Sequence, residues 1–175
     1  MGRVTRILLA TVVAVAGLAG CTSPTSGLIV NGETVLTVAD VGAIRQAYTD
    51  VVEPMGYSPL SDDEIITGYA QGAVASHLIE LFGLELDDSE VVSSLNELGV
   101  AVYSNPTTSG YVTAVLKWST IQYQMAQAGL DDSALTVLLD GLDVEVNPRY
   151  GQWSNQTLSL VNVGLALAEP LTTVV

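Results

Sequence analysis

The chain has very few residues of the kinds that build reaction centres. It contains one cysteine, Cys21, and one histidine, His77, among 175 residues. A disulfide within the chain needs two cysteines and is excluded, and one cysteine beside a single histidine supplies too few ligands for a thiol-based metal site. Glu80 is the one carboxylate within three or four residues of His77, whereas a histidine that works as a base or metal ligand needs several partners. We expect a structural histidine, no metal, no cofactor and no enzymatic activity.

Positive charge is also scarce. Five lysines and arginines stand against 19 aspartates and glutamates, a net charge of −14. Two of the arginines precede residue 21, so a chain that begins at Cys21 keeps three basic residues and has a net charge of 3 − 19 = −16. Such a chain is repelled by nucleic-acid phosphates and by anionic lipid headgroups. We therefore expect no nucleic-acid partner, and interpret the acidity as a source of solubility or as an attraction for basic partners.

A long apolar run is missing, but a short one lies near the start of the chain. Residues 7–20 form an uncharged stretch of 14 residues behind two arginines, which is typical of a signal peptide and short of the roughly 20 residues of a spanning helix. The stretch ends in Leu18-Ala19-Gly20-Cys21, which matches a lipobox. It predicts cleavage between Gly20 and Cys21 and lipid on the Cys21 thiol. We expect a lipoprotein anchored to the extracytoplasmic face of the cell membrane through a tether at 21–27; the alternative is an ordinary secretory signal with a chance cysteine.

Three segments share the signature of a helix start. An N-cap residue is followed three positions later by an acid, between two apolar residues, at Thr37, Ser61 and Asp87. This spacing lets the cap and the acid satisfy each other's backbone N–H groups, so the paired carboxylates here are capping residues and not a calcium site. With glycines as stop signals, the predicted helices span 37–52, 61–82, 87–99, 108–128 and 131–140. The helix at 108–128 is apolar over more than half its circumference and is expected to be the most buried.

Two further segments have strand character. Residues 28–35 are mostly apolar and contain Asn31-Gly32, a pair that favours a tight hairpin turn. Residues 142–146 alternate apolar and acidic side chains, as in a strand with one wet face. The apolar stretch at 158–168 is too short to cross a membrane.

Both strand segments carry motifs that resemble a chaperone family. Val30-Asn31-Gly32-Glu33 and the residues up to Val41 resemble the opening strand, turn and helix of SurA-like N-terminal domains, found in SurA, PrsA and trigger-factor-related chaperones. The segment Asp143-Val144-Glu145-Val146-Asn147-Pro148-Arg149-Tyr150-Gly151-Gln152-Trp153 is similar to the ending of small SurA-N-like lipoproteins of high-GC Gram-positive bacteria. The resemblance implies a mainly α, five-helix domain over residues 28–153. The early and late segments would form a short two-stranded β pairing, and residues 154–175 would be a C-terminal tail.

The resemblance also implies a function. The predicted helices fill the residues between the two motifs and leave no segment for a parvulin isomerase domain. His77 also cannot supply the paired histidines of such a site. We therefore expect a chaperone-like lipoprotein that binds unfolded or exported polypeptides without isomerase activity. Tyr111, Trp118 and Tyr123 are the candidate peptide contacts, with core packing as the alternative interpretation. The alternative function is an adaptor that binds a single folded protein of the envelope.

Overall fold

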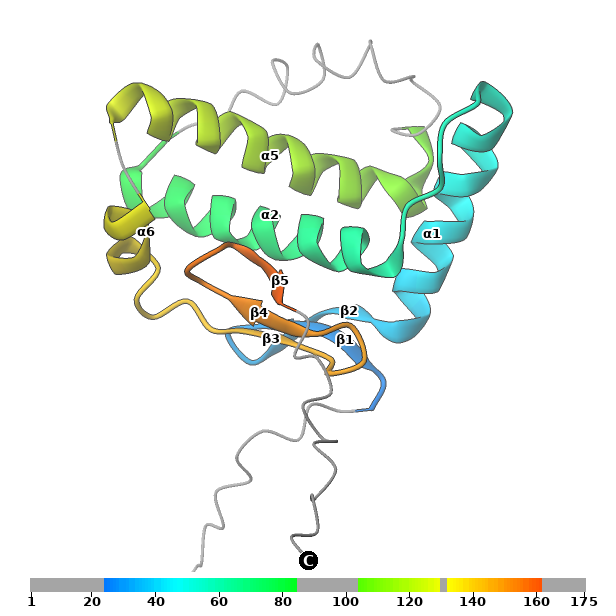
Figure 1. Cartoon of the computed structure of the whole chain (residues 1–175), viewed down its shortest axis with the longest axis horizontal. Coiled ribbons are helices and arrows are strands. Elements are labelled where there is room, and N and C mark those ends of the chain that lie inside the picture. Colours follow the sequence, from blue (N-terminus) through cyan, green and yellow to red (C-terminus); the bar gives the residue numbers. More distant parts are fainter. Residues whose placement is uncertain (1–23, 85–103, 130–131, 162–175) are drawn as a thin grey trace, which may run out of the picture.

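The computed structural model describes residues 24–84, 104–129 and 132–161. Helix α5 lies over α2, the strands lie on the opposite side of α2, and α1 closes one end (Figure 1). The elements in chain order are β1 (Ser26–Val30), β2 (Glu33–Thr37), α1 (Val38–Val52), the 3-10 turn η1 (Glu53–Met55), α2 (Asp62–Phe82), α5 (Pro106–Ala128), α6 (Asp132–Leu138), β3 (Val144–Val146), β4 (Gln152–Ser154) and β5 (Ser159–Val161).

The predicted fold class, a mainly α five-helix domain with one two-stranded pairing, is wrong. The described residues contain three long helices of 15, 21 and 23 residues, one short helix of 7 residues and two small antiparallel sheets. One sheet has three strands in the order β2-β1-β3, and the other pairs β4 with β5. The helix predicted at 87–99 lies outside the described residues. Three of the five described strands are only three residues long. One of them, β3, lies in the segment whose alternation predicted a strand, whereas β4 and β5 are too short to give such a pattern.

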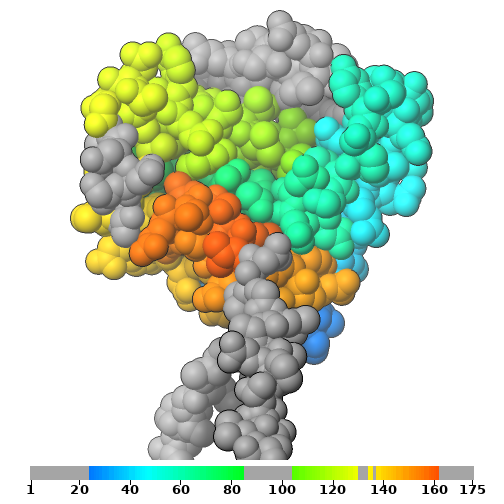
Figure 2. Space-filling model, viewed as in Figure 1, coloured from blue at the N-terminus to red at the C-terminus, as the bar shows by residue number. Residues whose placement is uncertain are grey.

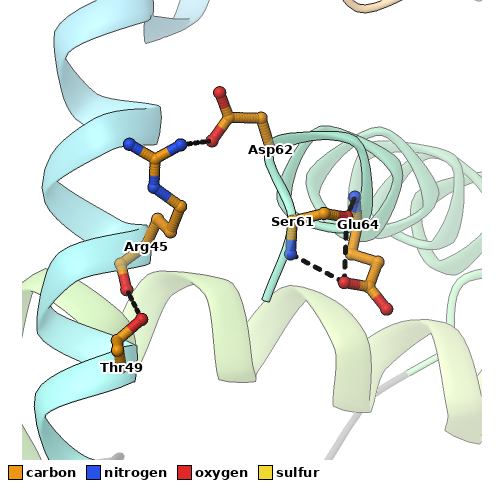
Figure 3. Close-up of polar contacts among 5 residues, drawn as sticks. All are labelled: Arg45, Thr49, Ser61, Asp62 and Glu64. Carbon is orange, nitrogen blue, oxygen red and sulfur yellow. Dashed lines mark hydrogen bonds and ion pairs between the residues drawn. The ribbon is translucent and has the colours of Figure 1, made fainter. Parts of the chain in front are cut away.

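The predicted helix starts at Thr37 and Ser61 are confirmed. Thr37 Oγ1 accepts from the backbone N–H of Asp40 at 3.1 Å, and Asp40 Oδ2 accepts from that of Thr37 at 2.8 Å. Ser61 and Glu64 make the same exchange at 3.2 and 2.7 Å (Figure 3). Two N–H groups at each helix start, which have no partner inside the helix, are thereby satisfied. The acidic side chains also stabilise the positive helix N-termini.

An ion pair joins the start of α2 to α1. The Arg45 guanidinium on α1 donates to Asp62 Oδ1 at 2.8 Å (Figure 3). The arginine side chain is 51% exposed, so solvent screens the pair and its contribution to stability is small. It is a surface contact between the two helices.

The early and late strand segments lie side by side in the three-stranded sheet. The predicted turn at Asn31-Gly32 is present, with φ of 50° and 80° at the two residues. β1 pairs antiparallel with β2 and also with β3, where Leu28 faces Val146. The predicted contact between the two segments therefore exists, although within three strands and not two.

Two asparagines of the family-like motifs tie this sheet together. Asn31 Oδ1 accepts from the backbone N–H of Asp143 at 3.0 Å. Asn147 Nδ2 donates to the carbonyl oxygen of Ser26 at 2.7 Å, and its backbone N–H donates to Gly27 at 3.0 Å. These bonds fix the first described strand of the chain against residues more than a hundred positions later.

The most buried long helix is α2 and not α5. Eight residues of α2 are buried, against six of α5. α2 touches α5 on one side and the strands on the other, which no helix at the edge of the molecule can do (Figure 1). Small residues make this central position possible, because they let both neighbours come close. Side chains with less than 2% exposure fill the centre of the core, among them Leu28, Ile65, Ile66, Leu78, Ile121 and Leu139.

Candidate functional site

The three aromatic residues predicted to contact peptide do not share one surface. Tyr111 and Trp118 are seven residues apart on α5 and lie on one face of the helix. Tyr111 is half-buried and Trp118 is 7% exposed, whereas Tyr123 is 68% exposed. Tyr123 lies five residues after Trp118, which places it more than a third of a turn away from that face. Tyr111 and Trp118 each line a hollow of the molecule, and Tyr123 lines neither.

A hollow of about 540 Å³ surrounds Trp118. It lies between α2, α5, α6 and the turn that joins β4 to β5. Its walls combine apolar side chains with three glutamines, and none of the described residues that line it is charged. They are Gln71, Trp118, Gln122, Met125, Ala126, Leu135, Gln156, Thr157 and Leu158.

A second hollow, of about 360 Å³, lies beside Tyr111. Gln71 lines both hollows, so the two follow one another along α2. The second is acidic at the α2 N-terminus, through Asp63 and Glu64. Its remaining lining residues are Thr67, Gly68, Tyr111, Val115, Ser159 and Leu160. We call the two hollows together the hairpin groove, because the β4–β5 turn lines one side of the first and β5 lines one side of the second.

The β4–β5 hairpin is held against α2 by a side-chain bond. Gln71 Nε2 donates to the carbonyl oxygen of Leu158 at 3.0 Å. Leu158 has a φ of 49°, unusual for a residue with a branched side chain, and the chain reverses sharply there. Trp153 on β4 is 9% exposed, and its indole N–H donates to Asn155 Oδ1 at 2.7 Å. Figure 2 shows the orange and red hairpin packed against the green surface of α2 and α5. The hairpin lies in segments predicted as a turn and as part of the tail.

Two glycines of α2 explain how close α5 comes. A Cβ atom added to Gly72 would lie 2.5 Å from Ala114 Cβ and 2.8 Å from its Cα. One added to Gly68 would lie 2.6 Å from the Tyr111 ring. The spacing Gly68-x-x-x-Gly72 puts both glycines on one helix face. The absent side chain of Gly68 also keeps open the hollow beside Tyr111.

Three tyrosines pack together at the α1 side of the groove. The Tyr111 ring meets that of Tyr48 edge-on at 6.1 Å and that of Tyr69 at 6.2 Å. Burial raises the pKa of Tyr111 to about 12, and the charges of Tyr48 and Glu64 act in the same direction. Tyr111 therefore stays neutral near pH 7, and its phenol is a packing group and a hydrogen-bonding group but not a base.

His77 is not among the residues that line the groove. Its Nε2 is 3.3 Å from the carbonyl oxygen of Leu138, which joins α2 to α6. No group of three or more histidine, cysteine, aspartate or glutamate side chains within the described residues could hold a metal ion. The geometry around His77 thus gives no observation that favours a metal centre there.

A third hollow, of about 420 Å³, lies at the other end of the two long helices. It is lined by Phe82, Leu84, Ile121, Gln124, Met125 and Ala128. Among the described residues that line it, Gln124 is the one polar side chain and none is charged.

The glutamines of the groove were missed by sequence reasoning. Gln71, Gln122 and Gln156 come from α2, α5 and the β4–β5 turn, and no spacing in the sequence links them. The Gly68-x-x-x-Gly72 spacing was the one available signal, because it marks a face where another helix comes close. The predicted lipidation site, Gly20 with Cys21, lies outside the described residues.

Comparison with other proteins gives no family from which a function could be assigned, so the function has to be argued from the site. No protein-family model, curated protein sequence or solved structure matches the chain. Within the described residues, no helix combines the length and the apolar character needed to cross a bilayer.

Proposed function

We propose that the chain is a chaperone-like lipoprotein that binds extended segments of exported polypeptides in the hairpin groove, without isomerase activity. Lipid on Cys21 would anchor it to the extracytoplasmic face of the cell membrane. The observation that carries the proposal is the groove itself, two consecutive hollows of about 540 and 360 Å³ along α2. Hollows of roughly 300–1,000 Å³ with an apolar wall and a few placed polar groups are the usual form of a ligand site.

The chemistry of the groove supports binding and offers no route to a covalent step. Its hydrogen-bonding groups are carboxamides, hydroxyls and the two acids at the start of α2. One of these acids, Glu64, is already engaged in its capping box. A polypeptide in extended form presents alternating side chains and free backbone N–H and C=O groups, which match a channel of mixed amide and apolar character.

Two exposed alanines near the end of α5 provide a matched test. Ala126 lines the hollow around Trp118, whereas Ala128 lines the third hollow, outside the hairpin groove. We expect the chain from residue 22 onward to suppress aggregation of a denatured client protein, measured by light scattering. Ala126→Trp should fill the hollow around Trp118 and remove most of this suppression, and Ala128→Trp should leave it unchanged.

The same test can refute the proposal. A chain that neither slows aggregation nor binds any unfolded client is not a chaperone. Equal suppression of aggregation by both tryptophan variants would show that clients do not bind in the hollow around Trp118. A loss in Ala128→Trp alone would show that they bind in the third hollow. Anchoring is tested separately in the full chain by metabolic labelling with a tagged fatty acid, which should label the unchanged chain and should not label Cys21→Ser.

An adaptor role is the second candidate, and one feature favours it. Met55 and Tyr57, in the turn between α1 and α2, are 49% and 66% exposed. Figure 1 places this turn at the end of the molecule remote from the sheet that holds the first described residues. In-cell photocrosslinking from this turn and from the groove separates the two functions. Many crosslinked clients from the groove support the chaperone, and one partner from the turn supports the adaptor.

A further inference from the structure

The hollow around Trp118 differs from the neighbouring hollow beside Tyr111, which Asp63 and Glu64 line, in its lack of charge. The chain carries a net charge of −14, yet the described residues that line this hollow include no acid and no base. Charge therefore contributes little to the choice of its ligand. Selection has to come from hydrogen bonds and apolar contact.

Three carboxamides from three different elements meet at this hollow. Gln71 comes from α2, Gln122 from α5 and Gln156 from the β4–β5 turn. A carboxamide offers two N–H donors and one carbonyl acceptor, the same groups as a peptide bond. Gln71 uses one donor on Leu158, which fixes its position and leaves its other donor and its oxygen for a ligand.

The indole of Trp118 is a further donor at this place. The Trp153 N–H is bonded to Asn155, but for Trp118 no such bond is found within the part of the chain that the structure describes. Trp118 lines the hollow although the residue is only 7% exposed. Buried indoles usually donate to some acceptor. A ligand carbonyl in the hollow would supply one.

From these contacts we infer that the hollow around Trp118 is the main subsite of the groove. It forms hydrogen bonds with the main chain of an uncharged peptide segment and accommodates one large aliphatic side chain of that segment. This inference rests on the proposed function. Met125 and Leu135 form the apolar part of the wall that receives the side chain. A sugar is a poorer fit, because it needs an open aromatic face for stacking and Trp118 presents little of its ring.

The experiment uses the full chain, expressed so that it is processed and then solubilised in mild detergent. The probe is a blocked, uncharged heptapeptide with one central leucine, and binding is measured by calorimetry. Gln122→Leu removes the carboxamide at similar volume. Gln124→Leu is the matched control, because Gln124 lies on the same helix and lines the third hollow. Both side chains are exposed, so both variants should fold.

We expect Gln122→Leu to weaken binding about two- to tenfold, the loss typical of one neutral hydrogen bond. Gln124→Leu should leave binding unchanged. Methylation of the peptide nitrogen at the leucine should weaken binding by a similar factor. Raising the salt concentration about tenfold should change binding less than about twofold, since no charge pair is involved.

Each other result overturns a distinct statement. If Gln122→Leu and N-methylation leave the affinity for the heptapeptide unchanged, or if the affinity falls steeply with salt, the inference is refuted and the proposed function is unaffected. If neither the heptapeptide nor a denatured client protein binds, the proposed function itself fails. Binding of a neutral oligosaccharide that depends on Gln122, without peptide binding, reassigns the hollow to glycans. Gln156→Leu, from the opposite wall, provides an independent second variant for the same comparison.

Discussion

Alanine at Gly72 tests the closest contact in the structure, and alanine at Gly42 is its matched control. Both glycines lie within helices, Gly42 in α1 and Gly72 in α2. A Cβ atom at Gly42 meets nothing within 4 Å. Replacing a helical glycine by alanine in open space stabilises the folded state by about 0.5–1 kcal/mol. We therefore expect Gly42→Ala to raise the free energy of unfolding by about that amount.

At Gly72 the same gain is opposed by overlap with α5. The new Cβ would lie 2.5 Å from Ala114 Cβ and 2.8 Å from its Cα, whereas carbon atoms prefer about 3.5–4.0 Å. Because one of the atoms belongs to the backbone, no side-chain rotation relieves the overlap, and the helices must separate by about 1 Å. Overpacking of this kind costs about 1–3 kcal/mol. The overlap makes the difference in unfolding free energy between the two variants about 1–3 kcal/mol, with Gly72→Ala the less stable.

Urea unfolding followed by circular dichroism measures both variants on one scale. The double variant with Gly72→Ala and Ala114→Gly restores space on the other helix and should recover part of the loss. A coupling energy between the two positions identifies the overlap as the cause. If Gly72→Ala were as stable as Gly42→Ala, the close approach of α2 and α5 would be wrong, and with it the shape of the groove.

Two further predictions concern the sheet and the tyrosine cluster. Asn147→Ala removes the 2.7 Å bond to the carbonyl of Ser26, and because Ser26 is 5% exposed the loss should lower the unfolding free energy by about 1–3 kcal/mol. Gln46→Ala, which breaks an exposed bond on α1, should change it by less than about 0.5 kcal/mol; equal effects in the same urea assay would contradict the role of Asn147. For Tyr111, the folded pKa of about 12 exceeds the roughly 10 of an unfolded tyrosine. The unfolded chain therefore loses this proton first, and stability should fall as the pH rises from about 10 toward 12. Absorbance titration of phenolate should show a late step that Tyr111→Phe removes, and a titration with no late step would refute the burial of this ring.

Local signals in the sequence were sufficient for the ends of the main helices. Thr37 and Ser61 cap their helices as predicted, and Gly83 and Gly129 end α2 and α5 with positive φ. α5 begins at Pro106, two residues before the predicted start, because Asn105 is the cap and a proline is well suited to the first turn. These features depend on residues within a few positions of one another, and so they can be read from the sequence.

Long-range packing decided the features that the sequence left open. The hydrophobic pattern of α5 predicted the most buried helix, but the small residues of α2, such as Gly72, place α2 between α5 and the strands. In the sequence, Trp118 and Tyr123 are both aromatic residues of the same predicted helix. Their positions relative to α2 bury Trp118 and leave Tyr123 exposed. The short strands β4 and β5 form because α2 provides a surface, and Gln71 a bond, to hold them.

By itself, the sequence determined the capped helix ends, the Asn31-Gly32 turn and the lack of residues for a thiolate metal site, since these depend on composition or on near neighbours. Only the tertiary structure decided which aromatic side chains line a hollow and that Gln71, Gln122 and Gln156 meet there. The physical reason is that convergence of side chains from three elements depends on how those elements pack. Packing in turn depends on contacts between residues far apart in the chain.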